Sequence, residues 1–387
     1  MRARKGGGAQ GSFDLQMMGR CLTLAARAEG RTSPNPMVGA VLVRRGRVIA
    51  EAFHRGAGAP HAEATALRKA GSSARGATLY TNLEPCCHFG RTPPCVDAIL
   101  AMGIRRLVVA HQDPYELVNG KGLAAVRRGG IRVKVGPLRE EAMRLNERYL
   151  TFVTQGRPFV LVKAGMTLDG RIATSGGESR WITSRRSRSR ARQLRASFDA
   201  VMVGGNTARV DDPSLTAGPS SRKQSGPGRQ PIRVILDSHL SLPQGARLLR
   251  PGRSRPGGPV LIYTSRRPPK DRAELLARRG ATVVPVPTSA PGRLDMRAVL
   301  HNLAQRGATS VMVEGGGELI WSMLEAELVD KVAFFVSPIL VGGREAVPVV
   351  GGRGVRKLRD AFLLKELSVT RLGSDMLIEG YVSGRGV

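Results

Sequence analysis

The spacing of apolar residues along the chain switches repeatedly between two periods, which predicts helices alternating with strands. In the first part of the chain, segment 13–29 has apolar residues every three to four positions and predicts a helix. Two short apolar runs within 38–50 flank Arg45-Gly46 and predict a β-hairpin. Further helices are expected over 61–70, 94–102, 122–128 and 138–149, and further strands over 78–81, 106–110 and 131–135. This order predicts a layered α/β domain.

A second alternation begins after Gly156-Arg157-Pro158, the best candidate for a domain boundary. Strands are expected over 159–164, 200–203, 232–236, 260–263, 282–286, 310–313, 332–336 and 366–372. Helices are expected over 185–196, 271–279, 296–306 and 319–326. Two stretches rich in Gly, Pro, Ser and Arg, 218–230 and 251–259, predict exposed loops. We therefore expect a disordered basic tail over 1–12, one α/β domain over 13–155 and a second over 156–387.

The overall composition is that of a globular protein rather than a disordered or fibrous one. The chain has 387 residues, more than one hydrophobic core usually serves, with 41% hydrophobic and 24% charged residues. No apolar run is long enough to cross a bilayer, and the N-terminal residues lack the apolar stretch of a signal peptide. These features predict a cytoplasmic protein that does not insert into membranes.

A formal net charge of +31 is the unusual feature of the composition. Such a charge favours a polyanionic partner such as nucleic acid, or phosphorylated small molecules. The basic residues are scattered through both halves, with the densest run between Arg185 and Arg195. Aromatic residues make up only 4% of the chain, which argues against stacking of nucleic-acid bases. Nucleic acid is therefore the less favoured partner.

Three of the four cysteines fall within ten residues, which indicates a metal site more than a disulfide framework. His61-Ala62-Glu63 is followed by Pro85-Cys86 and by Pro94-Cys95. Zinc deaminases carry H-x-E followed by P-C-x-x-C, in which the Glu is a general acid/base and not a ligand. One imidazole and two thiolates leave one position of a tetrahedral zinc open for water. We expect His61, Cys86 and Cys95 to bind zinc and Glu63 to relay protons.

The separation of Cys86 and Cys95 departs from the simple motif, because the loop CHFGRTPP lies between the two thiolates. Cys87 and His88 are rival ligands. The alternative without a metal is a pair of buried cysteines and a capping histidine.

Four segments resemble the bifunctional deaminase–reductase family of riboflavin biosynthesis. They are TSPNPMVGAVLV (32–43), HAEATAL (61–67), LEPCCHFGRTPPC (83–95) and KAGMTLDGRIAT with ESRWITS (163–184). The resemblance implies a cytidine-deaminase-like three-layer domain followed by a dihydrofolate-reductase-like α/β domain. It also implies zinc-dependent deamination of a diaminopyrimidinone ribose phosphate, and then reduction of the ribosyl group to ribityl with NADPH. Association into a homo-oligomer through the reductase domain is a further expectation of the resemblance.

The resemblance also implies roles for individual residues. Asn35 would lie near the substrate base, and Asp211 and Lys163 would be the polar groups near the nicotinamide. Further substrate positions would be Ser179, Arg195, Leu215 and Glu314. Cofactor positions would be Gly165, Trp181, Thr207, Asp211, Ser238, Gly316 and Gly317. The glycine triplet 315–317 stands between an expected strand and an expected helix, where backbone amides can hold a phosphate.

Simpler interpretations exist for three of these positions. Trp181 is also compatible with core packing, Asp211 and Asp212 with capping the turn before Pro213, and Arg195 with a solvated charge.

Two departures from the family pattern stand out. Tyr115-Glu116 replaces an expected Asn-Pro, and Gly218 stands where an arginine for the substrate phosphate is expected. Arg222 or Arg209 are candidate substitutes. An alternative function is therefore a deaminase whose second domain is inactive or repurposed. Another, suggested by the charge, is a zinc deaminase that acts on nucleic acid.

Overall fold

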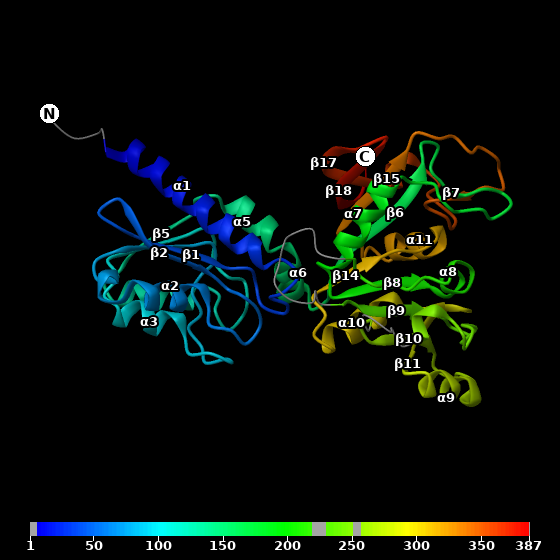
Figure 1. The fold of residues 1–387 in the computed structure, drawn as a ribbon, viewed down its shortest axis with the longest axis horizontal. Coiled ribbons are helices and arrows are strands. Elements are labelled where there is room, and N and C mark those ends of the chain that lie inside the picture. The colour runs from blue at the N-terminus through cyan, green and yellow to red at the C-terminus, as the bar shows by residue number, and fades with distance from the viewer. Residues whose placement is uncertain (1–5, 219–229, 251–256, 387) are drawn as a thin grey trace. The chain divides into compact units, whose positions relative to one another are not determined.

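The chain forms two compact units in a computed structural model of the protein, Met1–Gly156 and Arg157–Val387. The structure describes residues 6–218, 230–250 and 257–386. Each unit is a sheet covered by helices (Figure 1). The expected α/β class of both units is thus confirmed.

The first unit is built on a five-stranded sheet of order β2-β1-β3-β4-β5. The strands are β1 (Gly39–Arg44), β2 (Arg47–Phe53), β3 (Thr78–Thr81), β4 (Arg106–Val109) and β5 (Arg132–Val135). Strands β1 and β2 form the predicted hairpin, whose turn residues Arg45 and Gly46 have φ of 49° and 74°. Strands β3, β4 and β5 run parallel, so their carboxyl ends share one edge of the sheet.

Helices cover both faces of this sheet (Figure 1). One face packs on α1 (Gly6–Ala25) and α5 (Arg139–Leu145) through side chains such as Met18 and Ala142. The other face packs on α2 (Ala62–Ala70), α3 (Cys95–Ala101) and α4 (Lys121–Arg128). The result is the three-layer arrangement that the family resemblance implies.

The first helix begins earlier than expected. It starts at Gly6, inside the segment predicted to be a disordered tail, and it ends at Ala25, where a short 3-10 helix, Ala26–Ala28, follows. An i,i+4 hydrogen bond from the Gln10 amide to the Asp14 carboxylate supports this additional turn. Residues 1–5 lie outside the described residues.

The helix expected over 138–149 is instead two helices, α5 and α6 (Glu147–Gln155). The break falls at Asn146, whose side chain bonds both backbone groups of Met37. The Asn146 Oδ1 accepts from the Met37 N–H at 2.7 Å, and its Nδ2 donates to the Met37 carbonyl at 3.0 Å. This long-range contact leaves no signal in the local apolar pattern.

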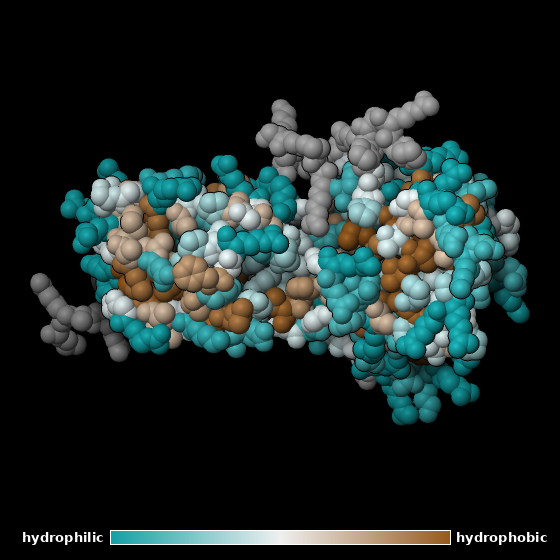
Figure 2. Space-filling view, turned by 90° about the horizontal axis from the view of Figure 1, so that it is seen from below, coloured by the Kyte–Doolittle hydropathy of each residue, from teal (hydrophilic) through white to brown (hydrophobic). Residues whose placement is uncertain are grey.

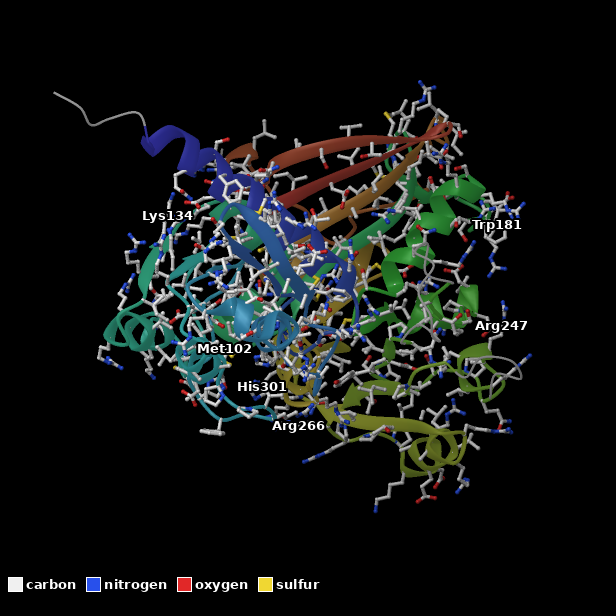
Figure 3. The ribbon with its side chains drawn as sticks, turned by 60° about the vertical axis from the view of Figure 1, so that its left-hand side comes forward. Met102, Lys134, Trp181, Arg247, Arg266 and His301 are labelled. Atoms are coloured by element: carbon white, nitrogen blue, oxygen red, sulfur yellow. The ribbon has the colours of Figure 1, made fainter. Side chains whose placement is uncertain are left out.

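The buried carboxylate of Asp14 anchors α1 to the sheet. It accepts hydrogen bonds from Tyr80 on β3 at 2.9 Å, from Arg106 on β4 at 2.7 and 2.9 Å, and from Lys134 on β5 at 2.8 Å. Figure 3 marks Lys134 on its strand. Burial alone would raise the pKa of Asp14, but Arg106, Lys134 and Tyr80 outweigh it and hold the pKa well below its usual range. The carboxylate is therefore ionised and paired with two cations.

Replacement of Asp14 by Asn should loosen α1. We expect a loss of about 3 kcal/mol, the lower end of the range for breaking a buried ion pair, because Lys134 keeps contact with water. Amide hydrogen exchange should accelerate in α1 and β4 and stay unchanged in Arg157–Val387. The exposed Glu29, replaced by Gln, is the control, since it removes the same charge near the end of the helix. Equal protection of α1 in both variants would contradict an anchoring role.

The second unit is built on a nine-stranded sheet of order β11-β10-β9-β8-β14-β6-β15-β18-β17. Its strands are β6 (Phe159–Thr167), β8 (Ala200–Gly204), β9 (Ile232–Leu236), β10 (Val260–Ser265), β11 (Ala281–Val286), β14 (Ser310–Val313), β15 (Lys331–Ser337), β17 (Phe362–Leu372) and β18 (Asp375–Arg385). Two small sheets pair β7 (Arg171–Ala173) with β16 (Val347–Pro348), and β12 (Thr288–Ala290) with β13 (Arg293–Leu294). From β11 to β15 the strands of the large sheet are parallel, which aligns their carboxyl ends along one edge.

Among the residues that the structure describes, five helices cover the large sheet. Two of them pack on one face: α10 (Met296–Gln305) and α11 (Gly317–Glu325). Three pack on the other: α7 (Arg185–Arg195), α8 (Gly205–Asp211) and α9 (Lys270–Arg278). In the view of Figure 2, hydrophilic side chains cover most of the surface and apolar ones form smaller patches among them. Some of the basic residues are exposed, for example Arg185 and Arg190.

The chain's last strands differ from the prediction. Strand β17 starts four residues before the expected segment 366–372, and β18 was not expected at all. Both are explained by pairing, because β18 lies between β15 and β17 and bonds to each. Most of the expected loops 218–230 and 251–259 fall outside the described residues. Within the described part of the chain, no helix is both long and apolar enough to cross a membrane.

Candidate functional site

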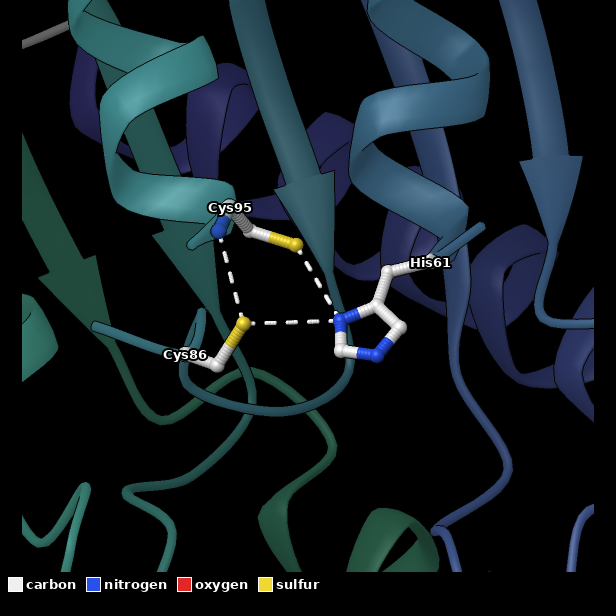
Figure 4. Close-up of side chains that lie close together, drawn as sticks. All are labelled: His61, Cys86 and Cys95. Atoms are coloured by element: carbon white, nitrogen blue, oxygen red, sulfur yellow. Dashed lines mark hydrogen bonds between the residues drawn. The ribbon is translucent and has the colours of Figure 1, made fainter. Parts of the chain in front are cut away.

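Three metal-ligand side chains converge in the first unit (Figure 4). His61 is the residue before α2, Cys86 follows β3 in a loop, and Cys95 opens α3. The His61 Nδ1 lies 3.4 Å from the Cys86 Sγ and 3.3 Å from the Cys95 Sγ. Their ligand atoms all lie within 4.8 Å of one another.

These distances fit a tetrahedral zinc ion. Bonds of about 2.0–2.3 Å to nitrogen and sulfur place ligand atoms of one tetrahedron roughly 3.5 Å apart. The Cys95 backbone N–H also donates to the Cys86 sulfur at 3.3 Å. Cys95 and His61 lower the pKa of Cys86, which favours the thiolate that binds zinc. The Thr92 hydroxyl lies 3.4 Å from the other ring nitrogen of His61 and helps to orient the ring.

Glu63 lies beside this cluster, in the first turn of α2. Its Oε2 is 3.8 Å from the Cys95 Sγ, and its side chain is 4% exposed. Burial raises the pKa of Glu63 to about 7. A carboxyl group with this pKa exchanges protons readily near neutral pH.

The two rival ligands point elsewhere. The Cys87 sulfur donates to the Leu117 carbonyl at 3.6 Å, and the His88 ring packs edge-on against Tyr115 with ring centres 5.9 Å apart. Among the described residues, the only three-residue metal-ligand group is His61, Cys86 and Cys95.

A cavity of about 340 Å³ opens onto the cluster. Its lining includes Pro34, Asn35, His54, His61, Glu63, Cys86, His88, Arg91, Asp113, Tyr115 and Tyr149. The volume suits one small ligand.

Asn35 is held in this cavity by His54. The His54 Nδ1 lies 3.3 Å from the Pro60 carbonyl, which can only accept, so this nitrogen carries the proton. Burial lowers the pKa of His54 and keeps the ring neutral, so its Nε2 accepts from the Asn35 amide nitrogen at 3.1 Å. The Asn35 amide oxygen is left as the group that can accept a hydrogen bond from a ligand.

Glu84 is a structural part of the site that the sequence analysis missed. It is buried and accepts backbone hydrogen bonds from Asp113, Gly120 and Leu123 at 2.9–3.1 Å. These bonds fasten the loop after β4 to the end of β3, next to Cys86. A glutamate just before Pro-Cys was the available signal, but the motif gives it no chemical role.

In the second unit, Lys163, Arg195 and Glu314 form a buried charged cluster. The Glu314 carboxylate lies 2.5 Å from the Arg195 Nε and 3.3 Å from the Lys163 Nζ. The three side chains are only 10–18% exposed, so Arg195 is not a solvated charge. Burial would raise the pKa of Glu314, but Arg195 and Lys163 outweigh it and lower the pKa to about 2.

Gly165 is part of β6, and Trp181 lies in the loop that precedes α7. A Cβ on Gly165 would stand 3.2 Å from the Thr183 side chain, so this face of β6 has little room for one. Trp181, labelled in Figure 3, is 70% exposed, which rules out core packing. The Arg188 guanidinium carbon lies over its ring, 4.2 Å from the ring centre.

Asp211 ends α8 and accepts a hydrogen bond from the Ser179 hydroxyl at 3.4 Å. Its neighbour Asp212 accepts from the Arg247 backbone N–H at 2.7 Å. Asp212 is therefore occupied in structuring the chain, and Asp211 is the residue that joins Ser179.

Thr207, Gly316 and Ser238 follow three neighbouring parallel strands, β8, β14 and β9. A Cβ on Gly316 would lie 3.7 Å from the Thr207 hydroxyl oxygen, an ordinary contact, so these two residues are neighbours. Gly317 has no room for a side chain, because its Cβ would stand 2.6 Å from the Pro348 carbonyl oxygen. Gly317 therefore packs against the backbone of Pro348 and Gly351, and Gly316, beside Thr207, is the glycine at the start of α11 with room next to it for a ligand such as a phosphate.

The remaining positions to which the sequence analysis drew attention for substrate binding have different surroundings from one another. The Leu215 side chain is buried in the core at 1% exposure, so only its backbone can meet a ligand. Gly218 bonds the Arg192 carbonyl at 3.3 Å, and Arg209 bonds Asn206 at 2.8 Å. Arg222, the other candidate for the substrate phosphate, lies outside the described residues.

Two family models cover most of the chain. Residues 12–111 match the cytidine and deoxycytidylate deaminase zinc-binding region, and residues 158–378 match the RibD C-terminal domain. The group of His61, Cys86 and Cys95 lies within the first match, and the Lys163–Glu314–Arg195 cluster lies within the second.

Whole-chain relatives agree with both matches. The chain is 40% identical to the riboflavin biosynthesis protein RibD of Aquifex aeolicus, over 95% of this chain and 98% of that protein. It is 37% identical to the RibD of Escherichia coli, over 94% and 98% respectively. The structure of Acinetobacter baumannii RibD matches with a TM-score of 0.85 at 34% identity, covering 96% of this chain and 99% of that one.

A Thermotoga maritima structure matches with a TM-score of 0.78 at 34% identity, covering 96% of this chain and 99% of that one. That protein is a diaminohydroxyphosphoribosylaminopyrimidine deaminase/5-amino-6-(5-phosphoribosylamino)uracil reductase. The expected cofactors, zinc for the deaminase and NADPH for the reductase, follow from these matches and from the metal-ligand cluster. The chain belongs to the RibD family of bifunctional deaminase–reductases of riboflavin biosynthesis.

Proposed function

We propose that His61, Cys86 and Cys95 hold the zinc ion, that Glu63 is the proton relay of the deaminase, and that the adjoining cavity binds the phosphorylated diaminopyrimidinone. The convergence of three metal ligands and one buried carboxyl on a cavity of about 340 Å³ carries this proposal. When bound, zinc supplies a water of lowered pKa.

The chain's own residues would transfer protons, orient the pyrimidine and exclude bulk water. Glu63 takes one proton from the attacking water and delivers it to the ring nitrogen. It then carries the second proton of the added hydroxyl to the amino group, which leaves as ammonia as the carbonyl forms. Asn35, oriented by His54, offers its amide oxygen to an N–H group of the pyrimidine. The walls of the cavity hold the ring against the zinc site and limit the access of bulk water.

The adjacent cysteines allow a matched test of the zinc site. Replacement of Cys86 by Ser should reduce zinc content from one ion per chain to a small fraction and abolish ammonia release, because a thiolate ligand is lost. Replacement of Cys87 by Ser should leave both unchanged, since Cys87 faces the Leu117 carbonyl. Metal analysis of the purified proteins measures the first effect. Loss of zinc from the Cys87 variant instead would reassign the ligand.

In the second unit, we propose that Lys163 and Asp211 handle the proton of the ribosyl group during its reduction, and that Ser179, Arg195, Glu314 and the Leu215 backbone bind the substrate. NADPH supplies the hydride when bound. Lys163, held by Glu314, keeps its ammonium group at a defined place on β6. Ser179 and Asp211 are joined by their hydrogen bond on the neighbouring loop and helix.

We propose that the cofactor lies along the carboxyl ends of the parallel strands. Gly165 and Trp181 would border the nicotinamide, and Gly316, Gly317 and Thr207 the diphosphate, with Ser238 farther along the edge. NADPH oxidation that depends on the deaminated substrate tests the assignment. A deaminase that releases ammonia but leaves NADPH unchanged would favour the alternative of an inactive second unit, with Gly218 as the departure to examine.

We propose that the chain associates through its second unit. Strand β17 is an edge of the large sheet, and it exposes Leu367 by 60% and Val369 by 63%. Exposed edges of this kind are pairing surfaces. Analytical ultracentrifugation should show an oligomer that dissociates when Val369 is replaced by Asp. A monomeric wild type would contradict this proposal.

A further inference from the structure

The carboxyl end of β10 carries two arginines that none of the assigned roles uses. Arg266 and Arg267 follow directly on the last residue of that strand, Ser265, and both are exposed. Figure 3 marks Arg266 in this turn. Neither has an ion pair with a carboxylate among the described residues. The nearby Arg293 does, with Glu318 at 3.4 Å and Glu325 at 3.8 Å.

This turn adjoins the cofactor edge of the sheet. Strands β8, β9 and β10 are parallel neighbours, and Gly204, Leu236 and Tyr263 lie at one level in register. Beyond that level, the Ser265 hydroxyl donates to the Ser238 carbonyl at 3.0 Å. Ser265, which bonds Ser238, is therefore followed immediately in the chain by Arg266 and Arg267.

The direction of the cofactor follows from the same topology. A dinucleotide lies across the carboxyl ends of parallel strands, with its diphosphate at a helix N-terminus. Here the nicotinamide end belongs at β6, beside Lys163 and Gly165, and the diphosphate belongs at Gly316 and Thr207. The adenosine half must then extend away from β6, over β9 and toward β10.

We propose that Arg266 and Arg267 bind the 2′-phosphate of NADPH and thereby set the preference for NADPH over NADH. The proposal rests on the proposed position of the cofactor. A 2′-phosphate is the only charge that distinguishes the two dinucleotides, and guanidinium groups pair with phosphate through two parallel N–H donors. The hydroxyls of Ser238 and Ser265 are already donated to the carbonyls of Gly292 and Ser238, which leaves the arginines as the cations of this turn.

The test measures binding rather than turnover. Dissociation constants for NADPH, NADH, 2′,5′-ADP and 5′-AMP would be measured by calorimetry on the zinc-replete full chain. The proteins compared are the wild type, Arg266→Ala, Arg267→Ala and the double variant. The control is Arg279→Ala, which removes an equally exposed arginine between α9 and β11, at the opposite edge of the sheet.

We expect each single variant to weaken NADPH and 2′,5′-ADP about tenfold, the effect of losing one charge-assisted contact. Binding of NADH and 5′-AMP should stay within about twofold, because they lack the 2′-phosphate. The Arg279 variant should resemble the wild type for all four ligands.

Two kinds of result would overturn the inference, and they differ in whether they also contradict the proposed position of the cofactor. If the wild type prefers NADPH and the double variant keeps that preference, the two arginines are not the determinant, while the proposed cofactor position stands. If the wild type binds none of the four ligands, or binds NADPH and NADH equally, the inference fails, and in the first case the cofactor position fails with it.

Discussion

Replacement of Glu63 by Gln should lower the kcat of deamination by about 10²–10⁴-fold, the usual contribution of a positioned general acid/base. The amide has nearly the shape of the carboxyl group but cannot take a proton from water. Glu63 is buried beside the metal ligands and is not one of them, so the variant should keep its zinc. The measurement is ammonia release from the diaminopyrimidinone ribose phosphate, with metal content determined on the same sample.

The chain offers two controls for this variant. Asp97→Asn removes an acidic group from the first turn of α3, where the side chain is exposed, and should leave the rate unchanged. The second unit is an internal control, because the Glu63 variant supplied with the deaminated product should still oxidise NADPH at the wild-type rate. A zinc-loaded Glu63 variant with undiminished ammonia release would show that another group carries the proton.

Replacement of Glu314 by Gln should both destabilise the second unit and impair the reductase. The folded-state pKa of Glu314 is lowered from 4.5 to about 2. A depressed carboxyl pKa stabilises the fold above the unfolded-state value and loses that contribution as pH falls through the folded-state value. The contribution, about 3 kcal/mol, is therefore present above about pH 4.5 and disappears between about pH 4.5 and pH 2. In the variant, Arg195 and Lys163 are left as buried cations without a counter-ion.

The positions of the tryptophans allow the stability of the second unit to be measured separately from that of the first. Both tryptophans of the chain, Trp181 and Trp321, lie in the second unit, so their fluorescence reports its unfolding in urea. The free energy of unfolding of the variant should be lower by about 3 kcal/mol at pH 7, and the difference should shrink as pH falls below about 4.5. Glu345→Gln, at an exposed acidic residue, should show neither effect.

The catalytic consequence of the Glu314 variant has a separate readout. Without the carboxylate, Lys163 and Arg195 lose the group that positions them, so kcat/KM for reduction should fall while ammonia release is unchanged. If stability and reduction both match the wild type, the cluster has neither a structural nor a positioning role.

The local sequence pattern predicted an element correctly where the residues of that element alone determine its conformation. The hairpin turn at Arg45-Gly46 appears as predicted, because residues with positive φ are needed there and Gly46 adopts one readily. Strand β3 begins and ends at the predicted residues, and its Thr-Leu-Tyr-Thr sequence consists largely of residue types that favour strands. The helix over 138–149 was wrong because Asn146 bonds Met37, a contact that the local sequence does not contain.

The deaminase chemistry of this protein could be predicted largely from its sequence. The residue types of its metal-site motif seldom occur in this combination for any other purpose. One histidine, two Pro-Cys steps and a glutamate two residues from the histidine specify a zinc deaminase whatever the surrounding fold. Only the tertiary structure distinguishes the settings of adjacent candidates, and it supports Cys86 as the proposed ligand. Cys86 turns toward His61 and Cys87 turns toward Leu117, because the loop between β3 and α3 orients each side chain separately.

The same distinction holds for charged residues. In sequence, Arg195 is one arginine in a dense basic run and Asp14 is one acid in a helix. The fold buries Arg195 against Glu314, 119 positions away, and buries Asp14 against Arg106, 92 positions away. Long-range ion pairs have no local periodicity, and burial decides whether a charge is solvated or paired, so the tertiary structure alone assigns these roles.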